Sequence, residues 1–237
     1  MLAELCTELF ASLPRSDQRR RGTDYVRGLL DTRGRKSIRN IAAFLGDPAL
    51  EQSLHHFVTS STWGWTPVRQ VLARYVARVA PPQAWVVRPM VIPKAGENTV
   101  GVDKRFFPAF GQVLNAQQAV GVWAASPRLS VPVNWRLQLS RGWLDDGERR
   151  SRASIPDGVE SQTPEDFALG ACLDSALHWD LPVRPVVMEA GEADACAIAR
   201  KLRAAGLPLL IKVGSTLPVS VADPALPGHG GAVPLPA

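Results

Sequence analysis

The hydrophobic pattern changes at Pro81-Pro82, and this change constrains the fold more than any other feature of the sequence. Before the two prolines, apolar residues recur at helical spacing, and the last such run is Val68, Val71, Leu72, Tyr75, Val76 and Val79. After the prolines come β-branched and alternating segments, and then helical and strand segments take turns. This order predicts an α/β protein, with an N-terminal all-helical region followed by a mixed-sheet domain.

The first eighty residues predict a series of helices, at residues 2–13, 16–30, 38–45, 49–58 and 66–79. Ser37 is expected to cap the third helix, and Gly46-Asp47-Pro48 is a turn signal before the fourth. Two short helices joined by a tight turn are compatible with a helix-turn-helix, although most such pairs serve only for packing.

The region after Pro81-Pro82 predicts a sheet domain and then a tail. Strands are expected at residues 85–92, 99–107, 117–125, 131–139, 183–188 and 209–213, and helices at residues 164–179 and 193–205. Pro, Gly and Ala dominate from Pro218 onward, a composition typical of flexible segments. The predicted organisation is a helical region at 1–80, a sheet domain at 81–216 and a flexible tail at 217–237.

A strongly basic segment runs from residue 15 to residue 39, in a chain whose net charge is +5. Nine basic residues stand there against three aspartates, which leaves a local charge of +6. They are Arg15, Arg19, Arg20, Arg21, Arg27, Arg33, Arg35, Lys36 and Arg39. A solvated helix face is the ordinary explanation, but the neighbouring candidate helix-turn-helix favours contact with DNA phosphates.

Four polar residues, Gln52, Ser53, His55 and His56, occupy one side of the predicted fourth helix. Gln and Ser can read base edges in the major groove, and an ordinary exposed helix side explains them equally well. The two histidines are not expected to bind metal.

The cysteine spacing, the N-terminus and the length of the apolar runs argue against a zinc protein, a secreted protein and a membrane protein. The cysteines Cys6, Cys172 and Cys196 lack CxxC spacing, so neither a disulfide framework nor a zinc site is expected. The tryptophans expected in the core are Trp135, Trp143 and Trp179. The chain begins without the basic start and apolar centre of a signal peptide, and no apolar run approaches the roughly 18 residues of a membrane span. The sequence thus predicts a cytoplasmic protein with no membrane partner and no cofactor.

Several short sequence segments follow one another in a characteristic order and spacing. In the N-terminal region they are Tyr25-Val26-Arg27-Gly28-Leu29-Leu30, Ile41-Ala42, Trp63 and Tyr75-Val76. Later they are Val86-Val87, Pro93-Lys94, Val100-Gly101-Val102, Val120-Gly121-Val122 and Trp143-Leu144-Asp145-Asp146. This series covers about residues 8–213 and resembles bacterial insertion-sequence transposases with a DDE-type, ribonuclease H-like nuclease core.

The resemblance implies three acidic side chains that hold two divalent metal ions for cutting and joining DNA. It places the first acid at Arg88, where a cation would repel a metal ion. It places the second at Glu189, one methylene longer than the family's Asp. The third acid of the family lies beyond the last strand recognised, and no counterpart is expected here. The resemblance therefore implies a catalytically degenerate, C-terminally truncated member that is not an enzyme.

These features lead to the hypothesis of a domesticated, inactive transposase that binds double-stranded DNA as a transcriptional regulator or nucleoid-associated factor. The DNA contacts would be Arg15, Arg19, Arg20, Arg21, Arg27, Arg35, Lys36, Arg39, Gln52 and Ser53. The inactive core could supply contacts for a homodimer or another protein. Arg88 and Glu189 are expected to form a salt bridge in the former metal pocket, because a buried arginine needs a partner.

Two alternatives remain open on the sequence. One is a protein-interaction scaffold that has also lost its DNA contacts. The other is a decayed transposase fragment, with no role or with an inhibitory effect on active relatives.

Overall fold

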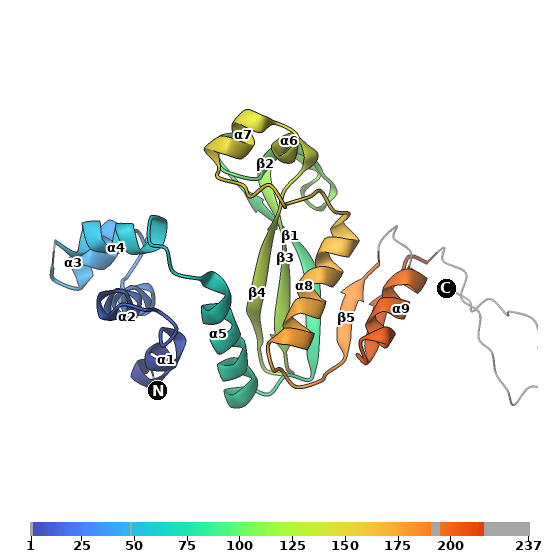
Figure 1. Ribbon diagram of the computed structural model, residues 1–237, viewed down its shortest axis with the longest axis horizontal. Coiled ribbons are helices and arrows are strands. Elements are labelled where there is room, and N and C mark those ends of the chain that lie inside the picture. Colours follow the sequence, from blue (N-terminus) through green and yellow to red (C-terminus); the bar gives the residue numbers. More distant parts are fainter. Residues whose placement is uncertain (1, 48, 191–194, 216–237) are drawn as a thin grey trace, which may run out of the picture. The chain divides into compact units, whose positions relative to one another are not determined.

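The computed structural model describes residues 2–47, 49–190 and 195–215 (Figure 1). The chain divides into two compact units, Met1–Pro81 and Pro82–Ala237, which are called here the helical unit and the sheet unit. The predicted tail at residues 217–237 lies outside the described residues. In the described part, no helix is both long and apolar enough to cross a membrane.

The helical unit has helices near the expected positions, namely α1 (Leu2–Leu9), α2 (Ser16–Asp31), α3 (Ile38–Phe44), α4 (Leu50–Thr59) and α5 (Trp65–Val79). Helix α1 ends at Leu9, earlier than expected, and a turn leads from it to Pro14. No strand lies in the described part of this unit, whose described elements are all helices.

Glycines let α3 and the turn after α1 approach α2 closely. A Cβ atom on Gly28 would lie 2.1 Å from Cγ2 of Ile41 in α3, and one on Gly22 would lie 2.8 Å from the ring of Phe10. Both glycines are buried within α2. A larger residue at either position would push its neighbour away from α2, so glycine is required here for packing rather than for backbone freedom.

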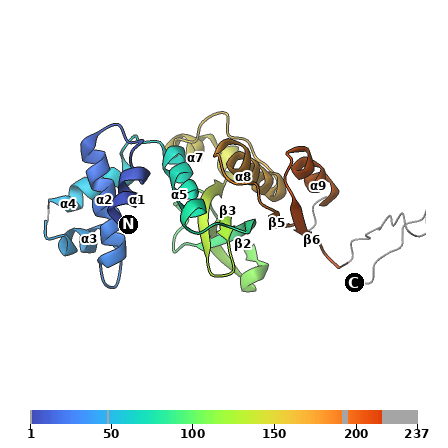
Figure 2. The ribbon, with the colours of Figure 1, turned by 90° about the horizontal axis from the view of Figure 1, so that it is seen from below.

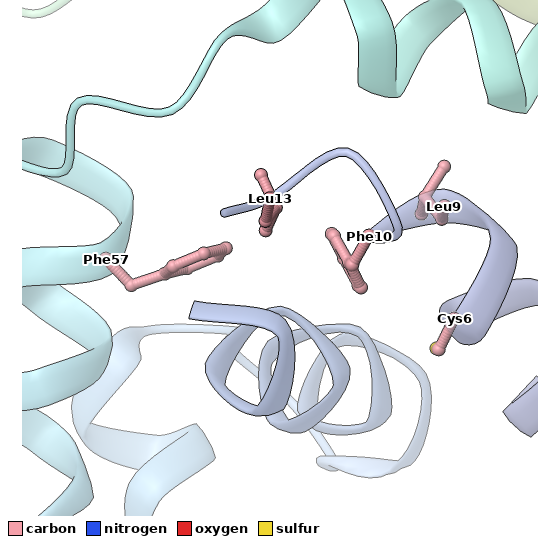
Figure 3. Close-up of a cluster of buried hydrophobic side chains, with 5 residues drawn as sticks. All are labelled: Cys6, Leu9, Phe10, Leu13 and Phe57. Atoms are coloured by element: carbon pink, nitrogen blue, oxygen red, sulfur yellow. The ribbon is translucent and has the colours of Figure 1, made fainter. Parts of the chain in front are cut away.

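Two apolar clusters form the core of the helical unit. In the first, buried side chains come together from α1, the turn after it and α4 (Figure 3): Cys6, Leu9, Phe10, Leu13 and Phe57. In the second, buried residues of α3 and α4 pack on one another: Ile41, Ala42, Leu50 and Leu54. Burial of these side chains is what holds helices as short as α3 in place, since an isolated helix of that length is not stable in water.

The pair α3–α4 has the local features that the sequence predicts. Ser37 is the N-cap of α3, and its Oγ accepts a hydrogen bond from the Asn40 backbone N–H at 3.2 Å. Gly46 follows the end of α3 with φ +75°, a conformation that glycine adopts without strain. Because Asp47 Oδ1 then accepts from the Ala49 backbone N–H, the chain turns directly into α4.

The sheet unit alternates strands and helices in an order that agrees with the sequence pattern. Its elements are β1 (Ala84–Pro93), β2 (Val102–Phe107), η1 (Pro108–Phe110), β3 (Gln112–Ala125), β4 (Ser130–Gln138), α6 (Arg141–Leu144), α7 (Gly147–Arg152), α8 (Pro164–His178), β5 (Val186–Glu189), α9 (Ala195–Ala204) and β6 (Leu209–Lys212). The short helices α6 and α7 were not expected.

The strands in the described part form one six-stranded mixed sheet. Along it the order is β2-β3-β1-β5-β6. Strand β4 lies off this path and pairs with β3 along residues 118–125, after the stretch of β3 that pairs with β2. Strand β3 is antiparallel to β1, β2 and β4, whereas β5 is parallel to β1 and to β6. This α/β arrangement is consistent with the ribonuclease H-like domain that the resemblance implies, and it makes β1 an interior strand.

The helices α8 and α9 lie on the same face of the sheet (Figure 2). Helix α8 contacts β1, β3 and β4, and α9 contacts β6. The Lys201 ammonium of α9 donates to Asp166 of α8 at 2.9 Å and lowers the pKa of that carboxyl. Two successive right-handed crossovers in the same direction along a sheet place both helices on one face, as observed here.

The tryptophans of the sheet unit are only partly where the sequence predicts. Trp143 and Trp179 are buried, as expected. Trp135, however, is 40% exposed and packs against Trp123 with 5.9 Å between ring centroids, so its expected place in the core is wrong. It lies on β4, where strand alternation turns its side chain away from the buried neighbour Asn134.

Candidate functional site

Strand β1 presents alternate residues to the two sides of the sheet. Trp85 and Val87 are buried, and Trp85 adjoins Cys172 of α8, whereas Arg88 is exposed. Side chains alternate along a strand, so Arg88 points to the face opposite α8. The same alternation in β5 buries Val186 and Met188 and exposes Glu189 on the side of Arg88.

Arg88 and Glu189 line the same hollow, which has a volume of about 270 Å³ and is called here the sheet hollow. Strands β1 and β5 are parallel, with Val86 paired to Val187, so two further steps along each strand bring Arg88 and Glu189 to the same level. In β6, Lys212 is the register partner of Glu189 and lines the hollow as well. The two positions that the resemblance assigns to acids therefore do converge.

The expected Arg88–Glu189 salt bridge is wrong. The Lys212 ammonium is the partner of Glu189, at 3.1 Å between Nζ and Oε1, and Arg88 makes no ion pair with any residue that the structure describes. The premise of that expectation fails too, because Arg88 is exposed and water can solvate its guanidinium. Both members of the Glu189–Lys212 pair are half-exposed or more, so the pair contributes at most about 1 kcal/mol to stability.

The residues of the sheet hollow do not fit the divalent metal ions that the resemblance implies. A pair of such ions needs several oxygen ligands and a negative site. Here two cations, Arg88 and Lys212, stand beside the single carboxylate of Glu189, and Lys212 already binds that carboxylate. Among the described residues there is no group of three His, Cys, Asp or Glu side chains that could hold a metal ion.

The helical unit carries a second hollow, of about 360 Å³, between the start of α2 and the exposed side of α4. Four of the residues proposed for DNA contact line this helix hollow together: Arg15, Arg21, Gln52 and Ser53. His56 and the buried Gln18 line it as well, and Gln18 donates to the Ser61 hydroxyl at 2.9 Å. Gln18 could not be predicted as part of this hollow, because a buried glutamine inside a basic helix has no distinct sequence pattern.

The arginines that line the helix hollow are already paired. Arg15 lies 3.1 Å from Asp17, and Arg21 lies 3.0 Å from Asp24. Of the other basic residues, Arg19 donates to the Leu13 carbonyl at 2.6 Å. Lys36 similarly donates to backbone carbonyls at the end of α2. These side chains therefore make local contacts within the helical unit as well as adding positive charge.

The remaining arginines of the basic segment have exposed side chains. These five, which are called here the open arginines, form no ion pair in the described part of the chain: Arg20, Arg27, Arg33, Arg35 and Arg39. They belong to α2, α3 and the loop between them. Guanidinium groups without carboxylate partners retain their donors for an external anion such as phosphate.

The cysteines form no reactive centre in the described residues. Cys6 and Cys172 are buried and form no disulfide, and Cys196 is exposed on α9. Burial raises the pKa of the Cys172 thiol to about 12, so this side chain does not supply a thiolate near neutral pH.

The comparisons with known proteins agree with this geometry. The family model described as DDE superfamily endonuclease matches residues 8–234, which is nearly the whole chain. No curated protein matches the chain. The interior strand β1, the parallel strand β5 and the convergence of Arg88 with Glu189 fit the fold that the resemblance implies. The chain belongs to the transposase-like family of DDE superfamily endonucleases.

Proposed function

We propose that this protein is a transposase-derived DNA-binding protein that does not cut DNA and acts as a transcriptional regulator or nucleoid-associated factor. The observation that carries the proposal is the set of open arginines in the helical unit, beside the α3–α4 pair. The family is one of endonucleases, so nucleic acid is the expected partner.

The open arginines suit the phosphates of the DNA backbone. A guanidinium binds phosphate through two parallel N–H donors, and contacts of this kind position a protein on a duplex without reading its sequence. Base readout would then come from the exposed side of α4, where Gln52 is exposed and Ser53 is half-buried. Gln52 can pair with adenine and Ser53 with several bases in the major groove.

The proposed loss of cleavage rests on the sheet hollow. The charges of Arg88 and Lys212 oppose metal binding at the place where the family's chemistry requires it. DNA affinity carried by the helical unit would survive that loss, because phosphate contact by arginine needs no metal ion.

Replacing three open arginines tests the proposal. The triple variant Arg20→Gln, Arg27→Gln and Arg39→Gln is expected to weaken duplex binding and to flatten the dependence of log K on log salt by up to about three units, since each phosphate contact contributes about 0.9. Fluorescence anisotropy of a labelled duplex at several salt concentrations measures both quantities.

A matched control removes the same charge from the sheet unit. Its triple variant, Arg128→Gln, Arg141→Gln and Arg203→Gln, changes exposed arginines that lie outside both hollows, and it is expected to shift the slope far less. Equal effects of the two triples would mean that only net charge matters. An unchanged slope in the first triple would favour a scaffold without DNA contacts.

A further inference from the structure

The sheet hollow has a charge and shape that suit an anion. Its charged residues come from three adjacent strands, with Arg88 on β1, Glu189 on β5 and Lys212 on β6. All three side chains are exposed. Glu189 and Lys212 end the parallel strands β5 and β6, and Arg88, in the middle of β1, lies at the level of Glu189. Ligands of open α/β sheets bind at the carboxyl ends of the parallel strands.

The balance of charge in the sheet hollow is positive. Glu189 is neutralised by Lys212 at 3.1 Å, which leaves the guanidinium of Arg88 without a partner among the described residues. Lys212 has three N–H donors and uses one on Glu189, so it can also donate to a bound anion. Its side chain is 75% exposed, and a pair so open to water reorganises at little cost.

The walls of the sheet hollow strengthen an ionic contact. Val86, Pro89 and Val187 line it beside the charged groups. Apolar walls lower the local dielectric constant, so a guanidinium–phosphate pair is held more strongly there than on an open surface. The volume of about 270 Å³ is several times the roughly 30 Å³ that one water occupies in the liquid, so a tetrahedral phosphate group fits.

We propose that the sheet hollow binds a phosphodiester group of DNA, with Arg88 as the principal donor and Lys212 as the second. The proposal rests on the proposed DNA binding, and it adds a contact outside the helical unit. The Arg88 guanidinium then supplies, without any metal ion, the positive charge that the DNA backbone contacts in the sheet hollow. Binding is thereby retained where hydrolysis is not.

Charge-changing and charge-conserving variants of Arg88 in the full-length protein test the proposal. Arg88→Gln is expected to flatten the salt slope of duplex binding by about 0.9, and Arg88→Glu by more, whereas Arg88→Lys keeps most of the slope. Lys212→Gln is expected to flatten the slope as well, because it removes the second donor and leaves Glu189 free to offset the charge of Arg88. The matched control is Arg203→Gln, another exposed arginine of the same unit, with no expected change.

A second readout identifies the source of the phosphate. The Nε–Hε resonance of Arg88, assigned by its loss in Arg88→Gln, is expected to shift when a short duplex is added in the presence of a chelator. A shift with inorganic phosphate alone, and none with the duplex, would overturn the proposal in favour of a site for small anions.

The outcomes separate this proposal from the proposed function. One outcome is that the wild-type protein binds duplex DNA, that the open-arginine triple weakens this binding, and that Arg88→Gln leaves the salt slope unchanged. In that case the sheet hollow is not a DNA contact, and only this inference fails. If the wild-type protein binds no duplex at any salt concentration, the proposed function fails and this inference fails with it.

Discussion

Supercoiled plasmid is expected to stay intact when it is incubated with the purified protein and magnesium or manganese. Catalysis by two metal ions requires carboxylates that hold the ions against the attacking and leaving oxygens. The sheet hollow instead presents Arg88, and its carboxylate Glu189 is bound to Lys212. Enzymes accelerate their reactions by about a million-fold or more, so loss of the metals should reduce nicking to the background level. Gel electrophoresis of the plasmid measures nicked and linear products.

Glu189→Ala is the control for this experiment. Nicking that persists unchanged in this variant comes from a contaminating nuclease, because no other carboxylate lines the sheet hollow among the described residues. Nicking that requires the metal and disappears in Glu189→Ala would contradict the proposed inactivity. In that case Glu189 would be a metal ligand despite its contact with Lys212.

Phe57→Ala is expected to destabilise the helical unit by about 3–5 kcal/mol. Phe57 is 5% exposed, stacks on Trp63 with 5.4 Å between ring centroids and meets Phe10 edge-to-face at 6.4 Å. Removing the ring leaves a cavity among the side chains shown in Figure 3. Single domains have only about 5–15 kcal/mol of stability, so much of the variant is expected to be unfolded in this unit and to lose DNA affinity.

Denaturant unfolding followed by circular dichroism measures this effect, and Val58→Ala is the control. Val58 neighbours Phe57 in α4 but is 37% exposed, so its truncation should change the unfolding free energy by about 0.5 kcal/mol or less. An unchanged midpoint for Phe57→Ala would mean that the cluster does not hold α4 against α1. Loss of DNA affinity in the Val58→Ala variant would instead point to contact through the surface of α4.

Much of the fold could be predicted because its signals are local. The alternation and β-branched runs of the sheet unit specify β1 and β4 to within about a residue. The start of β2 was misplaced because Val102 N–H bonds back to the Thr99 carbonyl and Gly101 adopts φ +78°, which forms a turn within the alternating run. Helix α7 could not be predicted, because six residues carry too little hydrophobic periodicity. Its N-cap is nevertheless an ordinary one, since the Asp146 side chain accepts from the backbone N–H groups of Glu148 and Arg149.

The candidate site was predictable in position but not in its contacts. Strand order follows from the resemblance and the alternation of elements, so the convergence of Arg88 and Glu189 could be foreseen. The partner of Glu189 could not be foreseen, because it depends on the register between β5 and β6, which places Lys212 opposite Glu189. In the helical unit, net charge did not reveal that Arg21 is paired with Asp24 while Arg20, one residue earlier, is open.

Genome-wide mapping of the protein on DNA, with the wild type and the open-arginine triple side by side, measures the proposed DNA binding in cells. The wild type is expected to occupy chromosomal DNA, at discrete sites for a regulator or broadly for a nucleoid-associated factor. A marked loss of that occupancy is expected in Arg20→Gln/Arg27→Gln/Arg39→Gln at equal protein abundance. Absence of wild-type occupancy above the background, in cells that contain the folded protein, would contradict the proposed DNA binding.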